Sequence, residues 1–125
     1  MRAPQWMNAI IGDFGRGAGV ENLALNDQGA LRFDFENGFA LQMEYVNEAL
    51  VVSVTLPAGS CPIVKLLMLS HPKARYGFRV RTALSPKTGR QILAVVLGER
   101  DVTPPRLNDV FGVLWRLAGE IGGAR

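Results

Sequence analysis

Few side chains in this sequence have the chemistry of an active site. The chain contains one histidine, His71, and one cysteine, Cys61. His71 lies between Ser70 and Pro72 at the predicted end of a helix, where a cation interacts favourably with the helix dipole, so a capping role is favoured over a general base. Cys61 lies just before Pro62, where the N-terminus of a helix could activate a thiol, but nothing else in the sequence supports thiol chemistry, which favours a small buried side chain. We therefore expect no enzymatic activity, with a small metabolic enzyme that depends on His71 as an open alternative.

A glycine-rich segment, residues 12–19, superficially resembles a phosphate-binding loop. It lacks the Gly-Lys-Ser/Thr ending of a P-loop, and it follows a predicted helix, whereas a dinucleotide fingerprint follows a strand. The C-terminus of a helix presents carbonyl groups, which disfavour phosphate. The segment therefore indicates helix termination. One cysteine and one histidine are too few for a typical metal site, and the acidic residues show no paired spacing, so no metal and no cofactor is expected.

Charge is distributed unevenly along the chain. The formal net charge is +3, with three basic and seven acidic side chains in residues 1–61 and eleven basic and four acidic ones in residues 62–125. Residues 73–90 carry only basic charges, which indicates an acidic protein partner or a solvated face. A small nucleic-acid-binding protein is the alternative, although the strand arginines point away from the aromatic side chains that base stacking needs. This basic patch comprises Lys73, Arg75, Arg79, Arg81, Lys87 and Arg90.

The elements that must position these residues follow from the periodicity of apolar side chains. Helical spacing predicts helices over residues 4–18, 60–71 and 103–121. The order αβββ(β)αββα predicts an α+β fold, a twisted antiparallel sheet with helices packed on it, formed from a three-stranded sheet and a two-stranded hairpin. Alternating apolar residues predict strands at 31–35, 39–45, 50–56, 76–84 and 91–97, with a short leucine segment at 23–25 as an optional further strand.

Length and composition set the scale of this fold. The chain has 125 residues, of which 48% are hydrophobic, which is sufficient for one domain, residues 1–125, with its own core. The first residues lack the apolar core of a signal peptide, and no window approaches the ~18 uninterrupted apolar residues of a membrane-spanning helix. We expect a soluble intracellular protein that does not bind membranes.

The second predicted helix carries information about assembly. Residues 60–71 are apolar nearly all round, so this helix requires burial on more than one side. Dimerisation through the helix and the strand that follows is the economical solution, and a fully buried core helix is the alternative. The predicted dimer interface comprises Ile63, Leu66, Leu67, Met68, Phe78 and Val80.

Two parts of the sequence resemble a known family. The first predicted helix ends in the phenylalanine- and glycine-rich residues 11–23, and the aromatic strand 31–35 follows. Residues 91–97 precede Leu107, Phe111 and the segment 114–117 of the last predicted helix. With the element order, these features resemble the class I type III secretion chaperones, the CesT/Tir-chaperone-like family. The C-terminal half is similar to the SycN branch, whose members serve a YopN-like gatekeeper protein.

The resemblance implies a bacterial cytoplasmic chaperone without catalytic activity. Its expected partners are a secreted effector or gatekeeper protein, and either a second copy in a homodimer or a second small chaperone in a heterodimer. Chaperones of this family are usually acidic, so the basic charge of this chain indicates an acidic dimer partner or client.

Such a chaperone holds an extended client segment in a secretion-competent state. Strand edges can pair with the client backbone while apolar pockets accept alternate side chains. The aromatic-rich hairpin has more apolar surface than a one-sided sheet must bury, and the first helix adds to it; ordinary core packing is the alternative. The predicted client-binding residues are Trp6, Ile10, Phe33, Phe35, Phe39, Leu41 and Met43.

Overall fold

The computed structural model describes residues 3–36, 38–57 and 80–122, with the side chains of residues 120–122 not described. The predicted helix at 60–71 and the first part of the predicted strand at 76–84 lie outside these residues. The elements are α1 (Gln5–Gly17), β1 (Ala30–Asp34), β2 (Ala40–Val46), β3 (Ala49–Leu56), β4 (Arg81–Leu84), β5 (Gln91–Gly98), the short 3-10 helix η1 (Glu99–Asp101) and α3 (Pro104–Gly122).

The five strands within the described residues form one antiparallel sheet in the order β1-β2-β3-β5-β4. The α+β fold class is confirmed, but the separate hairpin of the sequence prediction is not. β5 pairs with β3 along its whole length, from Ala49 opposite Gly98 to Leu56 opposite Gln91. Both strands are rich in β-branched and apolar residues, which suits the centre of a sheet. The hairpin is therefore the continuation of the sheet.

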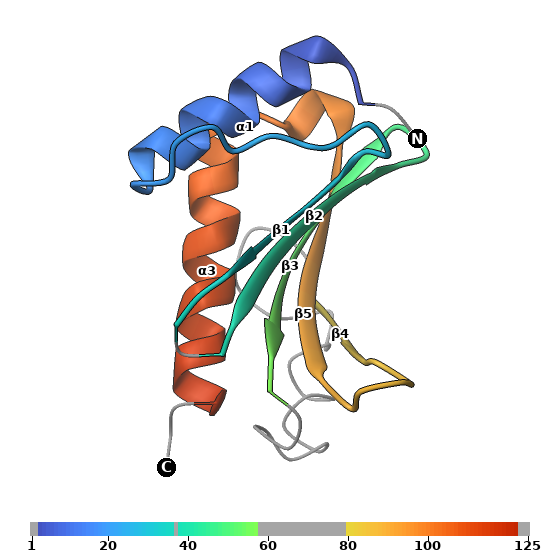
Figure 1. The fold of residues 1–125 in the computed structure, drawn as a ribbon, viewed down its shortest axis with the longest axis vertical. Helices are drawn as coiled ribbons and strands as arrows, with labels where there is room; N and C mark the ends of the chain where they lie inside the picture. Colours follow the sequence, from blue (N-terminus) through green and yellow to red (C-terminus); the bar gives the residue numbers. More distant parts are fainter. Residues whose placement is uncertain (1–2, 37, 58–79, 123–125) are drawn as a thin grey trace.

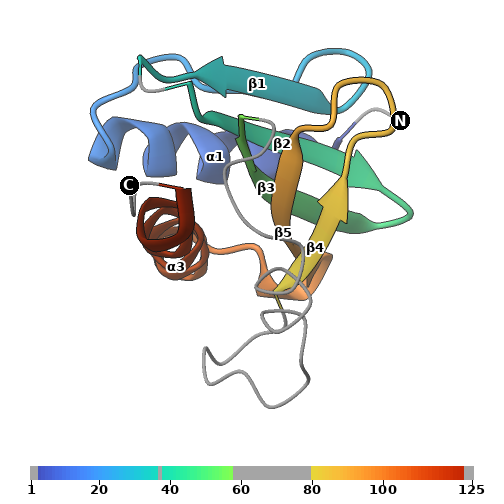
Figure 2. The same ribbon diagram turned by 90° about the horizontal axis from the view of Figure 1, so that it is seen from below.

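One face of the sheet carries the core. Figures 1 and 2 show α1 and α3 on the same side of the sheet, with α1 crossing near one end of α3. Alternate residues of the central strands point toward these helices and are buried, and each contributes about 1.5–3 kcal/mol by leaving water. No described helix covers the opposite face, which we call the outer face. The buried core includes Leu50, Val52, Val54, Leu93, Val95, Leu97, Leu107, Val110 and Leu114.

The buried face of α1 is rotated from the predicted one. The sequence repeat of Trp6, Ile10 and Phe14 predicts the core stripe, with Met7 and Ile11 beside it. In the structure Met7, Ile11 and Phe14 are buried, whereas 43% of Trp6 is exposed. In both the predicted and the observed stripe, residues three or four apart share one face of the helix. The apolar spacing therefore predicted the helix correctly but did not predict which face is buried.

The helix ends follow their sequence signals closely. Gly19, with φ +85°, ends α1: its N–H donates to the carbonyl of Arg16, and Val20 N donates to Gly15 O at 2.7 Å, the pattern of a Schellman motif. At the other helix, Thr103 Oγ1 accepts from Arg106 N at 3.3 Å and caps α3. The optional strand at 23–25 is absent.

Candidate functional site

An apolar hollow lies between the end of α1 and the sheet edge formed by β1. It holds about 370 Å³ of empty space, part of which is open to solvent, and its walls come from α1, the chain between α1 and β1, strands β1 and β2, and α3. Every residue around it is apolar or glycine, so it excludes charged groups and suits a large apolar side chain. The lining residues are Phe14, Gly15, Ala18, Val20, Leu23, Phe33, Phe35, Leu41 and Phe111.

The Schellman motif builds one wall of this hollow. Because Val20 N is bonded to Gly15 O, the chain folds back over the helix end and brings Val20 and Leu23 against Gly15. A β-carbon at position 15 would lie 2.7 Å from Leu23 Cβ and 2.9 Å from the Val20 carbonyl oxygen. Only glycine permits this approach. Further along, the Asn8 side-chain oxygen accepts from Leu25 N at 2.9 Å and holds the chain on its path toward β1.

Aromatic rings close the floor and the far side of the hollow. The centroids of Phe33 and Phe35 are 4.9 Å apart, and Phe35 lies 4.6 Å from Trp115 of α3. Phe14 of α1 meets Phe111 of α3 edge-on at 5.6 Å. These separations are within the range of favourable ring pairs, so helices and strand edge share one aromatic cluster.

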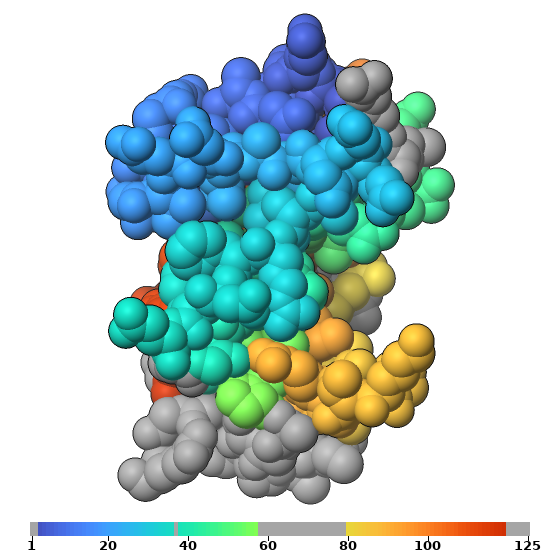
Figure 3. All heavy atoms as spheres, in the orientation of Figure 1, coloured from blue at the N-terminus to red at the C-terminus, as the bar shows by residue number. Residues whose placement is uncertain are grey.

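Among the described residues, no strand pairs with the edge of β1 beside this hollow. Phe35 N donates to Phe39 O, and Tyr45 N donates to Gly29 O, so the odd-numbered residues of β1 bond to β2. By the alternation of an antiparallel pair, Arg32 and Asp34 direct their N–H and C=O groups away from the sheet. Figure 3 shows the residues of β1 at the surface below α1. This edge is an available template for another strand.

The structure brings part of the predicted client-binding set together. Phe33 and Phe35 are half-buried and line the hollow, and Leu41 contributes to its floor. Met43 is only 1% exposed, so its side chain belongs to the core. Phe39 is also buried and packs against Trp115 at 5.5 Å.

The remaining predicted client-binding residues, Trp6 and Ile10, do not line the hollow. They lie toward the other end of α1, away from the C-terminal turn that forms the hollow. Phe14, Val20, Leu23 and Phe111 were missed as site residues. The glycine-rich helix end and the aromatic residues of α3 were their only sequence signals.

The predicted dimer and basic residues are described in part. Ile63, Leu66, Leu67, Met68, Phe78, Lys73, Arg75 and Arg79 lie outside the described residues, as do His71 and Cys61. Val80 is 1% exposed and belongs to the core of its own chain, so it is not available to a partner. Arg81 and Lys87 are exposed on β4 and the turn after it.

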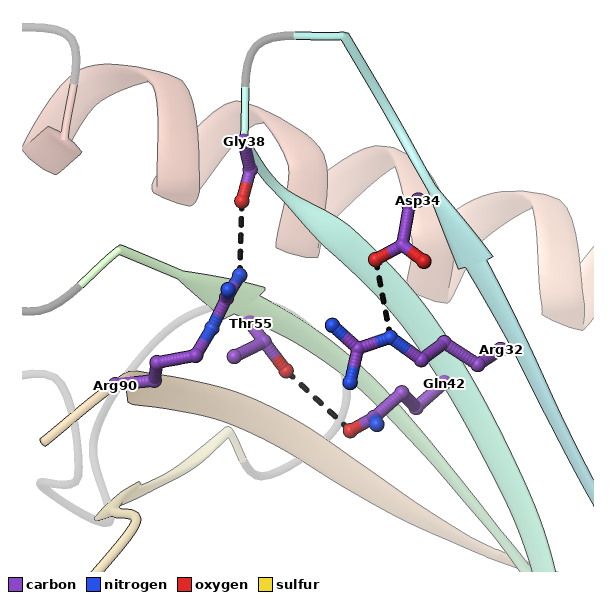
Figure 4. Close-up of polar contacts among 6 residues, drawn as sticks. All are labelled: Arg32, Asp34, Gly38, Gln42, Thr55 and Arg90. Atoms are coloured by element: carbon purple, nitrogen blue, oxygen red, sulfur yellow. Dashed lines mark hydrogen bonds and ion pairs between the residues drawn. The ribbon is translucent and has the colours of Figure 1, made fainter. Parts of the chain in front are cut away.

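Arg90 departs from the predicted basic patch. Its Nη2 donates to the carbonyl oxygen of Gly38 at 2.8 Å, and the side chain is half-buried. Figure 4 shows it passing Thr55 on the outer face of the sheet, while Arg32 pairs with Asp34 at 3.0 Å nearby. A side chain held in this way is not a freely solvated cation.

Among the titratable groups that the structure describes, Tyr45 has a strongly shifted pKa. The Tyr45 hydroxyl donates to Glu99 Oε1, and this hydrogen bond, with burial and the charges of Glu99 and Glu48, raises the pKa of Tyr45 to about 12. A neutral, buried tyrosine of this kind joins β2 to η1 and is structural. Over residues 3–36, 38–57 and 80–122, no three His, Cys, Asp or Glu side chains gather to hold a metal ion. No helix within those residues has the length and apolar character to cross a membrane.

Comparison with protein families decides what kind of protein carries this site. Residues 6–122 match the family described as type III secretory system chaperone SycN. The chain belongs to the SycN family. Because SycN is a chaperone family, this member is a binding protein of type III secretion and not an enzyme. The resemblance drawn from the sequence is confirmed, and the nucleic-acid alternative has no support.

Solved structures share the fold of this SycN-family member at low sequence identity. A chain of the ExsC–ExsE complex has a TM-score of 0.78 and 14% identity over 94% of this chain and 92% of its own. A chain of the HopA1–SchA chaperone–effector complex has a TM-score of 0.74 and 19% identity, covering 92% and 91%. No curated protein matches the chain.

A third structure of the same fold comes from Yersinia pestis. It is the type III secretion chaperone SycH in complex with a stable fragment of YscM2, with a TM-score of 0.71, 16% identity, and coverage of 92% of this chain and 98% of that chain. All three similarities extend over nearly the whole of each chain, so the fold is that of type III secretion chaperones.

Proposed function

We propose that this chaperone holds an extended segment of a secreted protein along the free edge of β1. The observation that carries the proposal is the position of that edge. The outward-directed backbone groups of Arg32 and Asp34 lie directly beside the apolar hollow. A binding surface with both features satisfies the client backbone and the client side chains at the same time.

The geometry of an added strand explains how such a site works. A client strand beside β1 gains backbone hydrogen bonds whatever its sequence, while its side chains alternate between the two faces of the extended sheet. Those on the helix side meet the hollow next to Phe33 and Phe35. Those on the outer side lie beside Arg32 and Asp34. The client therefore stays extended, which is the state that secretion requires.

The partners of similar proteins support this function. The structures with the same fold hold ExsE with ExsC, HopA1 with SchA, and a YscM2 fragment with SycH. Within the SycN branch, the client class is the gatekeeper of the secretion apparatus, and we propose such a protein here, bound in the bacterial cytoplasm.

The outer face of β5 is our candidate for the contact with a second chaperone subunit. Ile92 and Ala94 are half-buried there, and 43% of Val96 is exposed. A strand that is apolar on both faces indicates burial on both faces. The helices cover one of them, so a second subunit, either a copy or another small chaperone, would cover the other.

The strand-edge proposal is tested by a proline on the edge. Arg32→Pro removes an N–H that points away from the sheet and leaves every β1–β2 ladder bond in place. The matched control, Arg32→Ala, removes the same side chain and keeps the N–H. In the bacterium that encodes the chain, we expect affinity pull-down followed by mass spectrometry to recover a secreted protein with wild type and with Arg32→Ala. Recovery should fall at least about tenfold with Arg32→Pro, since a lost pairing site costs about 1.4 kcal/mol or more.

Two results would contradict the proposal. If Arg32→Pro, shown to be folded by circular dichroism, recovers the secreted protein as well as Arg32→Ala, the client does not pair with β1. If wild type recovers no secreted protein, the proposal that this site binds a secreted client is wrong.

A further inference from the structure

Arg90 connects two hairpins that are distant in the sequence. It follows the turn between β4 and β5, where its backbone is fixed because Ser85 N donates to Arg90 O at 2.9 Å and Arg90 N donates to Thr88 Oγ1 at 3.2 Å. Its side chain crosses the end of β3 on the outer face and reaches the β1–β2 turn, where Nη2 donates to Gly38 O (Figure 4). The arginine therefore spans three neighbouring parts of the sheet.

The turn that Arg90 reaches ends the edge strand β1. Phe35 N donates to Phe39 O at 2.9 Å and Gly38 N donates to Phe35 O at 3.1 Å, so the turn closes directly after Asp34. On the helix side, Phe35 and Phe39 pack against Trp115. On the outer side, the contact described for the turn carbonyl is Arg90. The end of the β1 edge is thus held from both faces.

The burial of Arg90 indicates a role beyond a surface charge. Its Nε is buried and, within the part of the chain that the structure describes, has no hydrogen-bond partner. A buried donor without a partner costs free energy, and the hydrogen bond from Nη2 to Gly38 O must offset that cost. The hydrogen bond that it does make orders the turn at the end of the β1 edge, where Gly38 has a φ of +89°.

We propose that Arg90 is a positioning residue that holds the β1–β2 turn so that the edge of β1 is ordered before the client arrives. This inference rests on the proposed client site at β1. The physical basis is preorganisation: if the edge is ordered only part of the time, the apparent dissociation constant rises by the inverse of that fraction. Arg90 raises the fraction without touching the client.

The experiment compares wild type, Arg90→Met, Arg90→Lys and Lys87→Met. Methionine keeps much of the length and apolar stem of arginine but cannot donate, lysine restores one donor, and Lys87→Met removes an exposed charge from the same hairpin. Hydrogen exchange is followed at the Phe35 and Gly38 amides in the free protein, with the Val52 and Val95 amides of the central strands as the internal reference.

Affinity is measured with a fluorescein-labelled ten-residue peptide of alternating leucine and serine. We expect Arg90→Met to speed exchange at Phe35 and Gly38 at least about fivefold, to leave Val52 and Val95 unchanged, and to weaken peptide binding about five- to tenfold. Arg90→Lys should recover part of both effects, and Lys87→Met should match wild type.

The outcomes separate this inference from the function on which it rests. Unchanged exchange and affinity in Arg90→Met overturn the positioning role, as does an equal loss of affinity in Lys87→Met, which would show an effect of charge alone. Faster exchange at Val52 and Val95 also overturns it, because the fold itself would then have loosened. If wild type does not bind the peptide while Arg90→Met still speeds exchange at the turn, the client site at β1 fails and the turn contact stands.

Discussion

At the scale of single residues, the site depends on the absence of a side chain at position 15. The folded-back chain after α1 passes so close to Gly15 that a β-carbon there would overlap Leu23 and the Val20 carbonyl. The Val20 carbonyl cannot easily move away, because the N–H of the same residue is hydrogen-bonded to Gly15 O. The wall of the hollow and the end of the helix are therefore set by one glycine.

Gly15→Ala is expected to destabilise the protein by about 1–3 kcal/mol, because the added methyl group must displace backbone in a packed wall. Urea denaturation followed by circular dichroism measures this free energy of unfolding. Gly17→Ala is the control. Gly17 lies in the same helix, and apart from its chain neighbours and the nearby backbone of that helix nothing lies within 4 Å of the place that a β-carbon would take. This substitution should stabilise by about 0.5–1 kcal/mol. Equal effects of the two substitutions would contradict the close approach at Gly15.

At the scale of elements, Tyr45 joins β2 to the short helix η1 that leads into α3. Its hydroxyl donates to the Glu99 carboxylate, and the turn between β2 and β3 is tied to the same place because Glu99 N donates to Glu48 O at 3.3 Å. Asn47 and Glu48 both have positive φ, at 51° and 60°, as a tight two-residue hairpin turn requires. The start of α3 is thus fixed to the central hairpin.

This connection has a defined pH dependence. The Glu99 hydrogen bond raises the pKa of Tyr45 from 10.0 to about 12 in the folded chain. The neutral hydroxyl is favoured by folding, so its contribution to stability is complete below pH 10 and is lost as pH rises from about 10 to about 12. Tyr45→Phe lacks this contribution. We expect wild type to exceed Tyr45→Phe in free energy of unfolding at neutral pH, and the difference to shrink across that window.

Denaturation of both proteins at a series of pH values gives this difference directly, and other titrating groups cancel because the two chains share them. A difference that stays constant through about pH 12 would show that Tyr45 does not donate to Glu99.

At the scale of the whole molecule, the sheet has two unlike faces. The helices bury one. The other leaves apolar side chains at the surface, among them Val96 of β5 and Val46 of β2. If the proposed second subunit packs on this face, Val96→Asp should dissociate the complex, because a charge in an apolar contact must be desolvated. Light scattering at micromolar concentration should shift from dimer to monomer mass, while circular dichroism stays unchanged.

The control for this prediction is Ala24→Asp, an exposed position before β1 and away from the outer face of β5. It should leave the mass unchanged. Native mass spectrometry of the wild-type complex identifies the second subunit as a copy or as a different small chaperone. A monomeric wild-type chain, co-expressed with its secreted protein, would contradict the assembly.

Local patterns in the sequence were sufficient for much of the fold. The capping residue Thr103 predicted the start of α3, and the glycines at 15, 17 and 19 predicted the end of α1, because both signals act within a few residues. Alternating side chains located β1, β2, β3 and β5 to within one residue. The segments 11–23 and 91–97, which resemble the secretion-chaperone family, predicted the function that the family comparison shows.

Tertiary structure decided how these elements meet. Alternation marks the faces of a strand but not its partner, so the pairing of β3 with β5 became clear only in the folded sheet. The hollow combines residues from five parts of the chain, and Arg90 reaches a carbonyl 52 positions away in the sequence. Interactions between residues close in the sequence, such as helix caps and side-chain alternation, therefore determined the helices and strands of this chaperone. The proposed binding edge at β1 and the Arg90 contact with its turn arise from long-range packing, for which neighbouring residues carry no signal.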